Sequence, residues 1–129
     1  MLKTGILNPA IHSLLARVRH TNTLVIADRG FPFFPTIETV DISLVDDIPR
    51  VLDVLRAIRA NFVVGRIYMA QEFHKVNEVG AYAALAEACD GAQLIEESHA
   101  DFKLRVPKAI GLIRTGDTTQ YGNLIIESA

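Results

Sequence analysis

The sequence has a single cysteine and no apolar run of about 18 residues, and each lack excludes a class of protein. The lone Cys89 excludes an internal disulfide framework and a zinc site built from cysteines. The first residues lack the apolar core of a signal peptide, so we expect a cytoplasmic protein with no membrane partner. A formal net charge of -2 disfavours nucleic acid as a partner, because nucleic-acid-binding proteins normally carry a basic patch.

Apolar residues are abundant instead. They make up 50% of the 129 residues, whereas charged residues make up 22%. This balance excludes intrinsic disorder, which requires low hydrophobicity and a high net charge. A chain of this length is enough for one domain with its own core, so residues 1–129 are predicted to form a single domain.

Apolar periodicity predicts helices that alternate with short strands. Helices are expected at 9–19, at 74–89 and from Ser98 to Val106. Another is expected behind a cap at Asp46 or Asp47, with Pro49 in its first turn and a buried stripe between Val51 and Ile58. Strands are expected at 23–27, 37–44, 63–70, 93–96, 109–113 and 123–126. The alternation predicts an α/β fold, with a largely parallel or mixed sheet flanked by helices.

Polar residues follow or precede several of these strands, where α/β sheets form their ligand sites. Asp28 directly follows the first strand, and His99 begins a helix after the strand at 93–96. His20 lies at the end of the first helix, just before the first strand. The candidate site residues are His20, Asp28, His99, Tyr121, Gly122 and Asn123.

Each candidate also has an ordinary structural interpretation. A histidine is favoured at a helix C-terminus by the helix dipole, and for an isolated His20 this interpretation is the favoured one. Asp28 is followed by Arg29 and Gly30, which is common turn chemistry. The segment 121–123 is equally compatible with a turn into a plain strand.

Motifs for cofactors and metals are missing. The sequence has no glycine-rich phosphate-binding motif, no His-Glu-x-x-His and no Gly-x-Ser-x-Gly. A zinc site made of His20, Asp28 and His99 has no local spacing to support it. We therefore predict no metal and no cofactor.

An ordered set of segments carries a resemblance over most of the chain. The segments are 3–8 (KTGILN), 19–22 (RHTN), 24–28 (LVIAD), 30–32 (GFP), 40–44 (VDISL), 98–103 (SHADFK), 113–117 (IRTGD) and 121–126 (YGNLII). In order and spacing they resemble the D-ribose pyranase / L-fucose mutarotase family. Arg19, where the family usually has glycine, and Arg29, where it has a small residue, depart from the pattern.

The resemblance implies a function and a site. It implies a metal-independent monosaccharide mutarotase or pyranase, in which His20 is the general acid/base. It implies that Asp28, His99 and the segment 121–123 bind the sugar substrate. It also implies a ring-shaped homo-oligomer, decameric or smaller, with sites at subunit boundaries and no cofactor. The alternatives are a non-catalytic sugar-binding or regulatory module of the same fold, and a metal-dependent enzyme of another class.

The segment 31–35 (FPFFP) bears on assembly. Its prolines prevent a helix or a central strand, so we expect a loop whose three phenylalanines need burial. Burial against a neighbouring subunit and burial in the chain's own core are both compatible with the composition.

Overall fold

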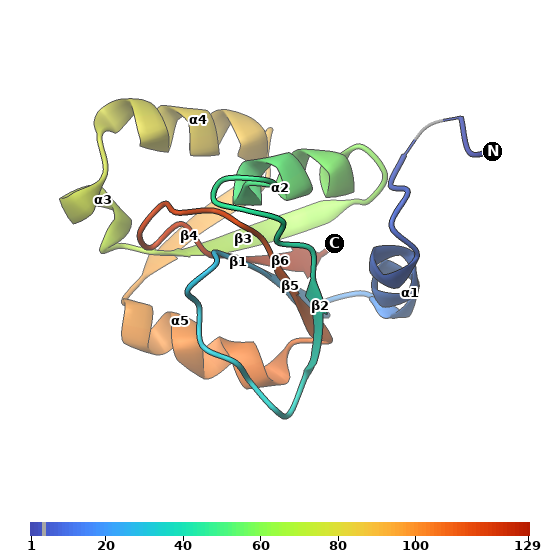
Figure 1. Cartoon of the computed structure of the whole chain (residues 1–129). Coiled ribbons are helices and arrows are strands. Elements are labelled where there is room, and N and C mark those ends of the chain that lie inside the picture. The colour runs from blue at the N-terminus through green and yellow to red at the C-terminus, as the bar shows by residue number, and fades with distance from the viewer. Residues whose placement is uncertain (4) are drawn as a thin grey trace.

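One mixed sheet organises the computed structural model, which describes residues 1–3 and 5–129 (Figure 1). Within those residues it has six strands in the order β2-β5-β1-β6-β3-β4. Their bounds are β1 Thr23–Ala27, β2 Glu38–Asp41, β3 Val64–Ala70, β4 Gln93–Glu97, β5 Gly111–Arg114 and β6 Leu124–Ser128. All run parallel except β6, which is antiparallel to its neighbours β1 and β3. The predicted α/β class with a mixed sheet is confirmed.

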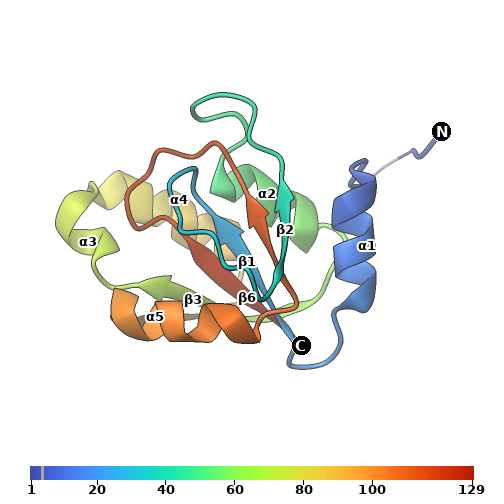
Figure 2. The same cartoon turned by 60° about the horizontal axis from the view of Figure 1, so that its bottom comes forward.

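Helices cover both faces of this sheet. Their bounds are α1 Pro9–Arg17, α2 Val51–Arg59, α3 Phe73–Val76, α4 Val79–Cys89 and α5 His99–Arg105, with a 3-10 turn at Val106–Lys108. Figures 1 and 2 show α2 and α4 on one face and α5 on the other. No helix in residues 1–3 and 5–129 is long and apolar enough to cross a membrane.

Two separate cores lie on the two faces of the sheet. In β1, Leu24 and Ile26 pack with the cluster under α1, α2 and α4, whereas Val25 and Ala27 pack with Phe102 of α5. This division follows from the alternation of side chains along a strand, and it explains why β1 is apolar throughout. The strand ends are thereby fixed between two packed layers.

The first helix is shorter than predicted, and this moves His20 out of it. Helix α1 ends at Arg17, and Val18 is already extended, with a ψ of 130° and a buried side chain. Thr21 then adopts a positive φ of 64° as the chain turns into β1. His20 therefore sits on an exposed turn between α1 and β1.

The prediction of one continuous helix over 74–89 is wrong. The chain leaves helical geometry at Asn77, which is extended, and resumes at Val79. The Asn77 side chain donates to the carbonyl oxygen of Phe73 at 3.0 Å. Such side-chain bonds compete with the main-chain hydrogen bonds of a helix, which is why asparagine is favoured at helix ends. Two helices, α3 and α4, result.

The predicted cap of the second helix is also wrong. Helix α2 starts at Val51, whose N–H donates to Asp117 Oδ2 at 2.8 Å, and Asp53 accepts from the N–H of Arg50. Asp47 binds Thr118 instead, at 2.8 Å. One of these two caps, Asp117, is far along the chain, and local sequence does not reveal it.

The strands also differ in length from the prediction. Strand β2 is only four residues long, because Asp41 Oδ1 accepts from both the N–H and the Oγ of Ser43 and turns the chain. Strand β5 begins at Gly111 and runs to Arg114. Strand β6 begins at Leu124 and ends at Ser128.

Candidate functional site

The C-terminal edge of the parallel strands gathers most of the candidate residues. Asp28 follows β1 and His99 follows β4, while Tyr121 and Asn123 precede β6, which starts at this edge because it is antiparallel. They surround a pocket of about 400 Å³. Its lining residues are Asp28, Gly30, Phe31, Pro32, His99, Gln120, Tyr121 and Asn123.

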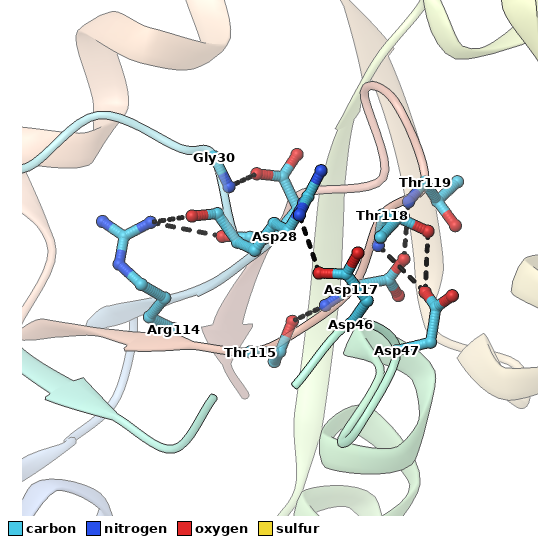
Figure 3. Close-up of polar contacts among 10 residues, drawn as sticks. Asp28, Gly30, Asp46, Asp47, Arg114, Thr115, Asp117, Thr118 and Thr119 are labelled. Carbon is cyan, nitrogen blue, oxygen red and sulfur yellow. Dashed lines mark hydrogen bonds and ion pairs between the residues drawn. The ribbon is translucent and has the colours of Figure 1, made fainter. Parts of the chain in front are cut away.

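Asp28 is held in this pocket by Asn123. The Asn123 Oδ1 accepts from the main-chain N–H of Asp28 at 2.7 Å, and its Nδ2 donates to Asp28 Oδ2 at 3.1 Å. The other carboxylate oxygen accepts from the N–H of Gly30 at 2.9 Å (Figure 3). Asn123 is only 4% exposed, so its amide is committed to this contact. The carboxylate is therefore oriented before any ligand arrives.

The main chain around Asp28 is held from β5 and the loop that follows it. Arg114 Nη1 donates to the carbonyl oxygens of Asp28 and Arg29, at 3.2 and 3.3 Å (Figure 3). Buried Thr115 donates its hydroxyl proton to the carbonyl of Ala27 and accepts from the N–H of Asp117. Every one of these groups is polar and paired, as buried polar groups require. The main chain from Ala27 to Arg29 is consequently tied by hydrogen bonds to Arg114 and Thr115.

His99 lies among aromatic rings. Its ring stacks on Phe102 with centroids 6.1 Å apart and meets Tyr121 edge-on at 5.1 Å and Phe31 edge-on at 6.5 Å. Its Nδ1 atom is buried and has no hydrogen-bond partner among residues 1–3 and 5–129. The residue is the first of α5, behind the cap Ser98, as the sequence predicts. The imidazole is thus packed between three aromatic rings.

Gly122 is not part of the pocket wall. It lies in the loop behind Tyr121 and lines a neighbouring cavity of about 370 Å³ between α2 and α4. A Cβ at Gly122 would meet Thr119 atoms at 3.1 Å, so a tight turn explains this glycine. Tyr121 itself has a positive φ of 56°, which costs energy for a non-glycine residue and points its ring toward His99.

His20 is not brought to this pocket within one chain. It precedes β1, whereas Asp28 follows β1, so the two lie at opposite edges of the sheet. At about 3.3 Å per residue, the strand between them spans about 16 Å. Asp28 therefore does not orient His20 in the same chain, and the three-residue zinc site of His20, Asp28 and His99 is ruled out there. In residues 1–3 and 5–129 no group of three or more metal-ligating side chains comes together.

The phenylalanines of the segment 31–35 divide between core and surface. Phe31 is buried beside Phe102 and stacks on the half-buried Phe34, so two of the three rings fold back onto the chain's own core. Phe33 is 70% exposed. Only one ring of this segment is thus left for a contact outside the chain.

Sequence reasoning missed several residues that shape the pocket. Gln120 lines it, although no pattern in the sequence assigns it a role beside Tyr121. Glu72, which accepts from the N–H of His99 at 2.6 Å, comes from a segment that carries no motif. Arg114 belongs to the segment 113–117, but its contact with the Asp28 carbonyl depends on strand order. Only the pairing of β1 with β5 brings them together.

Comparison with known proteins identifies the family to which the chain belongs. All of residues 1–129 match the family model described as the RbsD / FucU transport protein family. The chain belongs to the RbsD/FucU family. The resemblance drawn from the sequence is confirmed.

Relatives in the RbsD/FucU family share nearly the full length of the chain. The D-ribose pyranase of Chromobacterium violaceum is 41% identical over 128 residues, covering 99% of this chain and 97% of that protein. The D-ribose pyranase of Coprothermobacter proteolyticus is 34% identical over 128 residues, with the same coverage of 99% and 97%. The match therefore includes every candidate site residue, from His20 to Asn123.

Solved structures of the family agree with the fold. The structure of Bacillus subtilis RbsD complexed with D-ribose has a TM-score of 0.91 and 31% identity, covering 100% of this chain and 98% of that one. The fucose mutarotase of Streptococcus pneumoniae in complex with L-fucose has a TM-score of 0.83 at 18% identity, covering 99% and 98%. At that lower identity the likeness extends to the fold alone.

Proposed function

We propose that this chain is a monosaccharide mutarotase or pyranase that interconverts anomeric or pyranose and furanose forms of a sugar such as ribose, without a metal or cofactor. The observation that carries the proposal is the pocket of Asp28, His99, Tyr121 and Asn123, which is small, polar and preorganised. The family relationship supports it, since relatives named D-ribose pyranase align over 99% of the chain.

Interconversion of sugar ring forms requires only acid/base catalysis from the protein. Ring opening of a hemiacetal needs a base to take the anomeric hydroxyl proton while an acid protonates the ring oxygen, and closure reverses these roles. No electron transfer or external reactant is involved, and every proton released at one oxygen is taken up at the other. A site that holds the sugar between two proton-exchanging groups is therefore sufficient.

The pocket supplies binding and one of these groups. The fixed Asp28 carboxylate accepts sugar hydroxyl protons in charge-assisted hydrogen bonds. The Tyr121 ring offers an apolar face and a hydroxyl, and the His99 imidazole is able to donate or accept. The Phe31 and Pro32 side chains supply an apolar part of the pocket lining.

His20 serves as general acid/base from a second copy of the chain. Its turn is exposed yet held: Asn22 Oδ1 accepts from the Arg19 N–H, and the Thr21 N–H donates to the Ser128 carbonyl. An exposed imidazole on a hydrogen-bonded turn at one edge of the sheet, and a sugar pocket at the other, suit a ring of subunits, decameric or smaller. The exposed Phe33, next to the pocket residue Pro32, supports a contact there.

The test is exchange between sugar forms, followed by saturation-transfer NMR on ribose, fucose and related sugars. The proposal expects faster exchange with at least one of them, unchanged after treatment with a chelator. Saturable sugar binding without faster exchange would instead identify a non-catalytic sugar-binding module. Exchange lost with the chelator and restored by metal would identify a metal-dependent enzyme. A cytoplasmic location stays a prediction.

A further inference from the structure

The short segment 71–78, which contains α3, contributes no residue to the pocket wall but contacts both sides of it. The pocket is formed by two separate parts of the chain: α5, which carries His99, and the loop before β6, which carries Tyr121. The strands below them, β4 and β6, are not neighbours, because β3 lies between them. Sheet hydrogen bonds alone therefore do not join the two walls beyond the strand ends.

Glu72 joins the segment to the first wall. Its Oε2 accepts from the main-chain N–H of His99 at 2.6 Å, a short and charge-assisted bond across 27 positions of sequence. Beside it, the N–H of Gln71 donates to the carbonyl of Glu97 at 2.7 Å and prolongs the β3–β4 ladder by one step. The start of α5 is thus fixed by a carboxylate from outside the helix, in addition to its own cap Ser98.

Asn77 joins the segment to the second wall. Its Nδ2 donates to the carbonyl of Gln120 at 2.9 Å, one residue before Tyr121, and to the carbonyl of Phe73 at 3.0 Å. The same amide group therefore ends α3 and holds the loop. The break between α3 and α4 at this residue, which the helical pattern does not predict, makes this contact available.

The hydrogen bonds of Glu72 and Asn77 both bear on the distance between the rings of His99 and Tyr121. The His99 ring meets the Tyr121 ring edge-on at 5.1 Å, and the two rings come from parts of the chain that the segment 71–78 connects. Displacement by a fraction of this distance changes the space in which a sugar ring sits between His99, Tyr121 and Asp28.

We propose that Glu72 and Asn77 are positioning residues that set the separation of His99 and Tyr121, with the segment 71–78 as a brace behind the pocket. The proposal rests on the proposed function only where it concerns turnover; the placement of the His99 ring is independent of it. Neither residue lines the pocket, so both act through the main chain of the residues they hold.

The variants separate the hydrogen bonds from general stability. Glu72→Gln keeps an acceptor oxygen, whereas Glu72→Ala removes it. Asn77→Asp keeps the shape but replaces the donor with an oxygen that faces two carbonyls. The matched control is Ala86→Gly, at an exposed position in α4 away from the pocket, which weakens a helix without changing any of these bonds.

Two readouts are measured on the full-length protein in its native assembly. The first is the position of the His99 ring resonances, which the rings of Phe102 and Tyr121 shift, assigned by loss in His99→Gln. The second is the kcat and KM of ribose ring-form exchange. Glu72→Ala and Asn77→Asp should move the His99 resonances and lower kcat/KM by about tenfold or more. Glu72→Gln should stay within about threefold of the wild type, because its amide oxygen still accepts.

Two results would overturn the proposal. One is that Glu72→Ala and Asn77→Asp leave both the resonances and kcat/KM within about twofold of the wild type. The other is that Ala86→Gly, at an equal loss of stability, reproduces their effects, which would make the role one of general stability. If the wild type shows no exchange, the proposed function fails, and the His99 resonances alone decide the proposal.

Discussion

Asn123 and Asp28 are joined by two hydrogen bonds of opposite direction: Asn123 accepts from the Asp28 main-chain N–H and donates to the Asp28 carboxylate. The pair connects the end of β1 to the start of β6, two strands that run antiparallel side by side. A side-chain amide suits this point because it offers both a donor and an acceptor. The carboxylate that we assign to sugar binding therefore has its orientation set by the fold.

Asp28→Asn tests that assignment. The substitution removes the charge and places an NH2 group opposite either the Gly30 N–H or Asn123 Nδ2, so sugar affinity should fall by about tenfold or more, at least the value of one charge-assisted hydrogen bond. Titration of ribose against the protein, by calorimetry or NMR, measures it. The control is Asp46→Asn, which removes an exposed carboxylate paired at the surface with Arg29. Equal affinity in Asp28→Asn and the wild type would remove Asp28 from the site.

His20→Ala should separate catalysis from folding. The side chain is exposed, so the free energy of unfolding should change by less than about 0.5 kcal/mol. Exchange should fall by about a hundredfold or more, the range of one general acid/base. His12→Ala, in the helix before the same turn, is the control and should exchange normally. Full exchange in a folded His20→Ala protein would return His20 to the role of a turn residue.

Phe33→Asp tests assembly at the face beside the pocket. Phe33 is the phenylalanine of its loop that stays 70% exposed, so a charge there costs little in a single chain and much in an interface. Light scattering at micromolar concentration should show a smaller particle and, in the same sample, slower exchange. Val79→Asp changes another exposed apolar residue, at the start of α4, and should leave both unchanged. A wild-type monomer with full activity contradicts the predicted ring.

The Asp47 carboxyl makes the free energy of unfolding depend on pH in the acid range. Hydrogen bonds from the Thr118 hydroxyl and N–H lower the pKa of this carboxyl below its ordinary value of 3.8. Its contribution is therefore fully present above that ordinary pKa, which the unfolded chain retains, and is lost as the pH falls through the lower pKa of the folded state. Thr118→Val should reduce this loss, measured as the change in the midpoint of urea unfolding between about pH 5 and about pH 2.5, on either side of the usual aspartate pKa. An identical change in Asp47→Asn and the wild type would show that other carboxyls dominate.

The sequence predicts the alternation of elements because each has a clear apolar period. Strand β1 is apolar on both faces, and α1 begins at Pro9, as predicted, behind the cap Asn8. The ends of helices are harder to predict, because they depend on partners distant in sequence. The N-terminus of α2 is bound by Asp117, and the end of α3 is shaped by Asn77, whose other partner is Gln120. Neither contact leaves a local signal.

The candidate site divides in the same way. Residues at strand ends, such as Asp28 and His99, are predictable because parallel strands end at one edge of a sheet. The separation of His20 from the pocket follows from the same reasoning, because His20 precedes β1 and Asp28 follows it, so the length of the strand lies between them. Glu72 escapes prediction entirely, since it acts through the main chain of a residue 27 positions away.

The central claim is that sugar ring forms are exchanged at a site that combines His20 of one copy with the Asp28 pocket of another. It is tested most directly by co-expressing His20→Ala with Asp28→Asn and measuring ribose exchange by saturation-transfer NMR, well below the KM of the wild type. Each variant alone has one defect at every site, whereas random mixing in a ring leaves about one quarter of the sites with both residues intact. The account predicts that the mixture recovers about a quarter of the wild-type rate. A mixture no faster than the average of the two separate variants would contradict it.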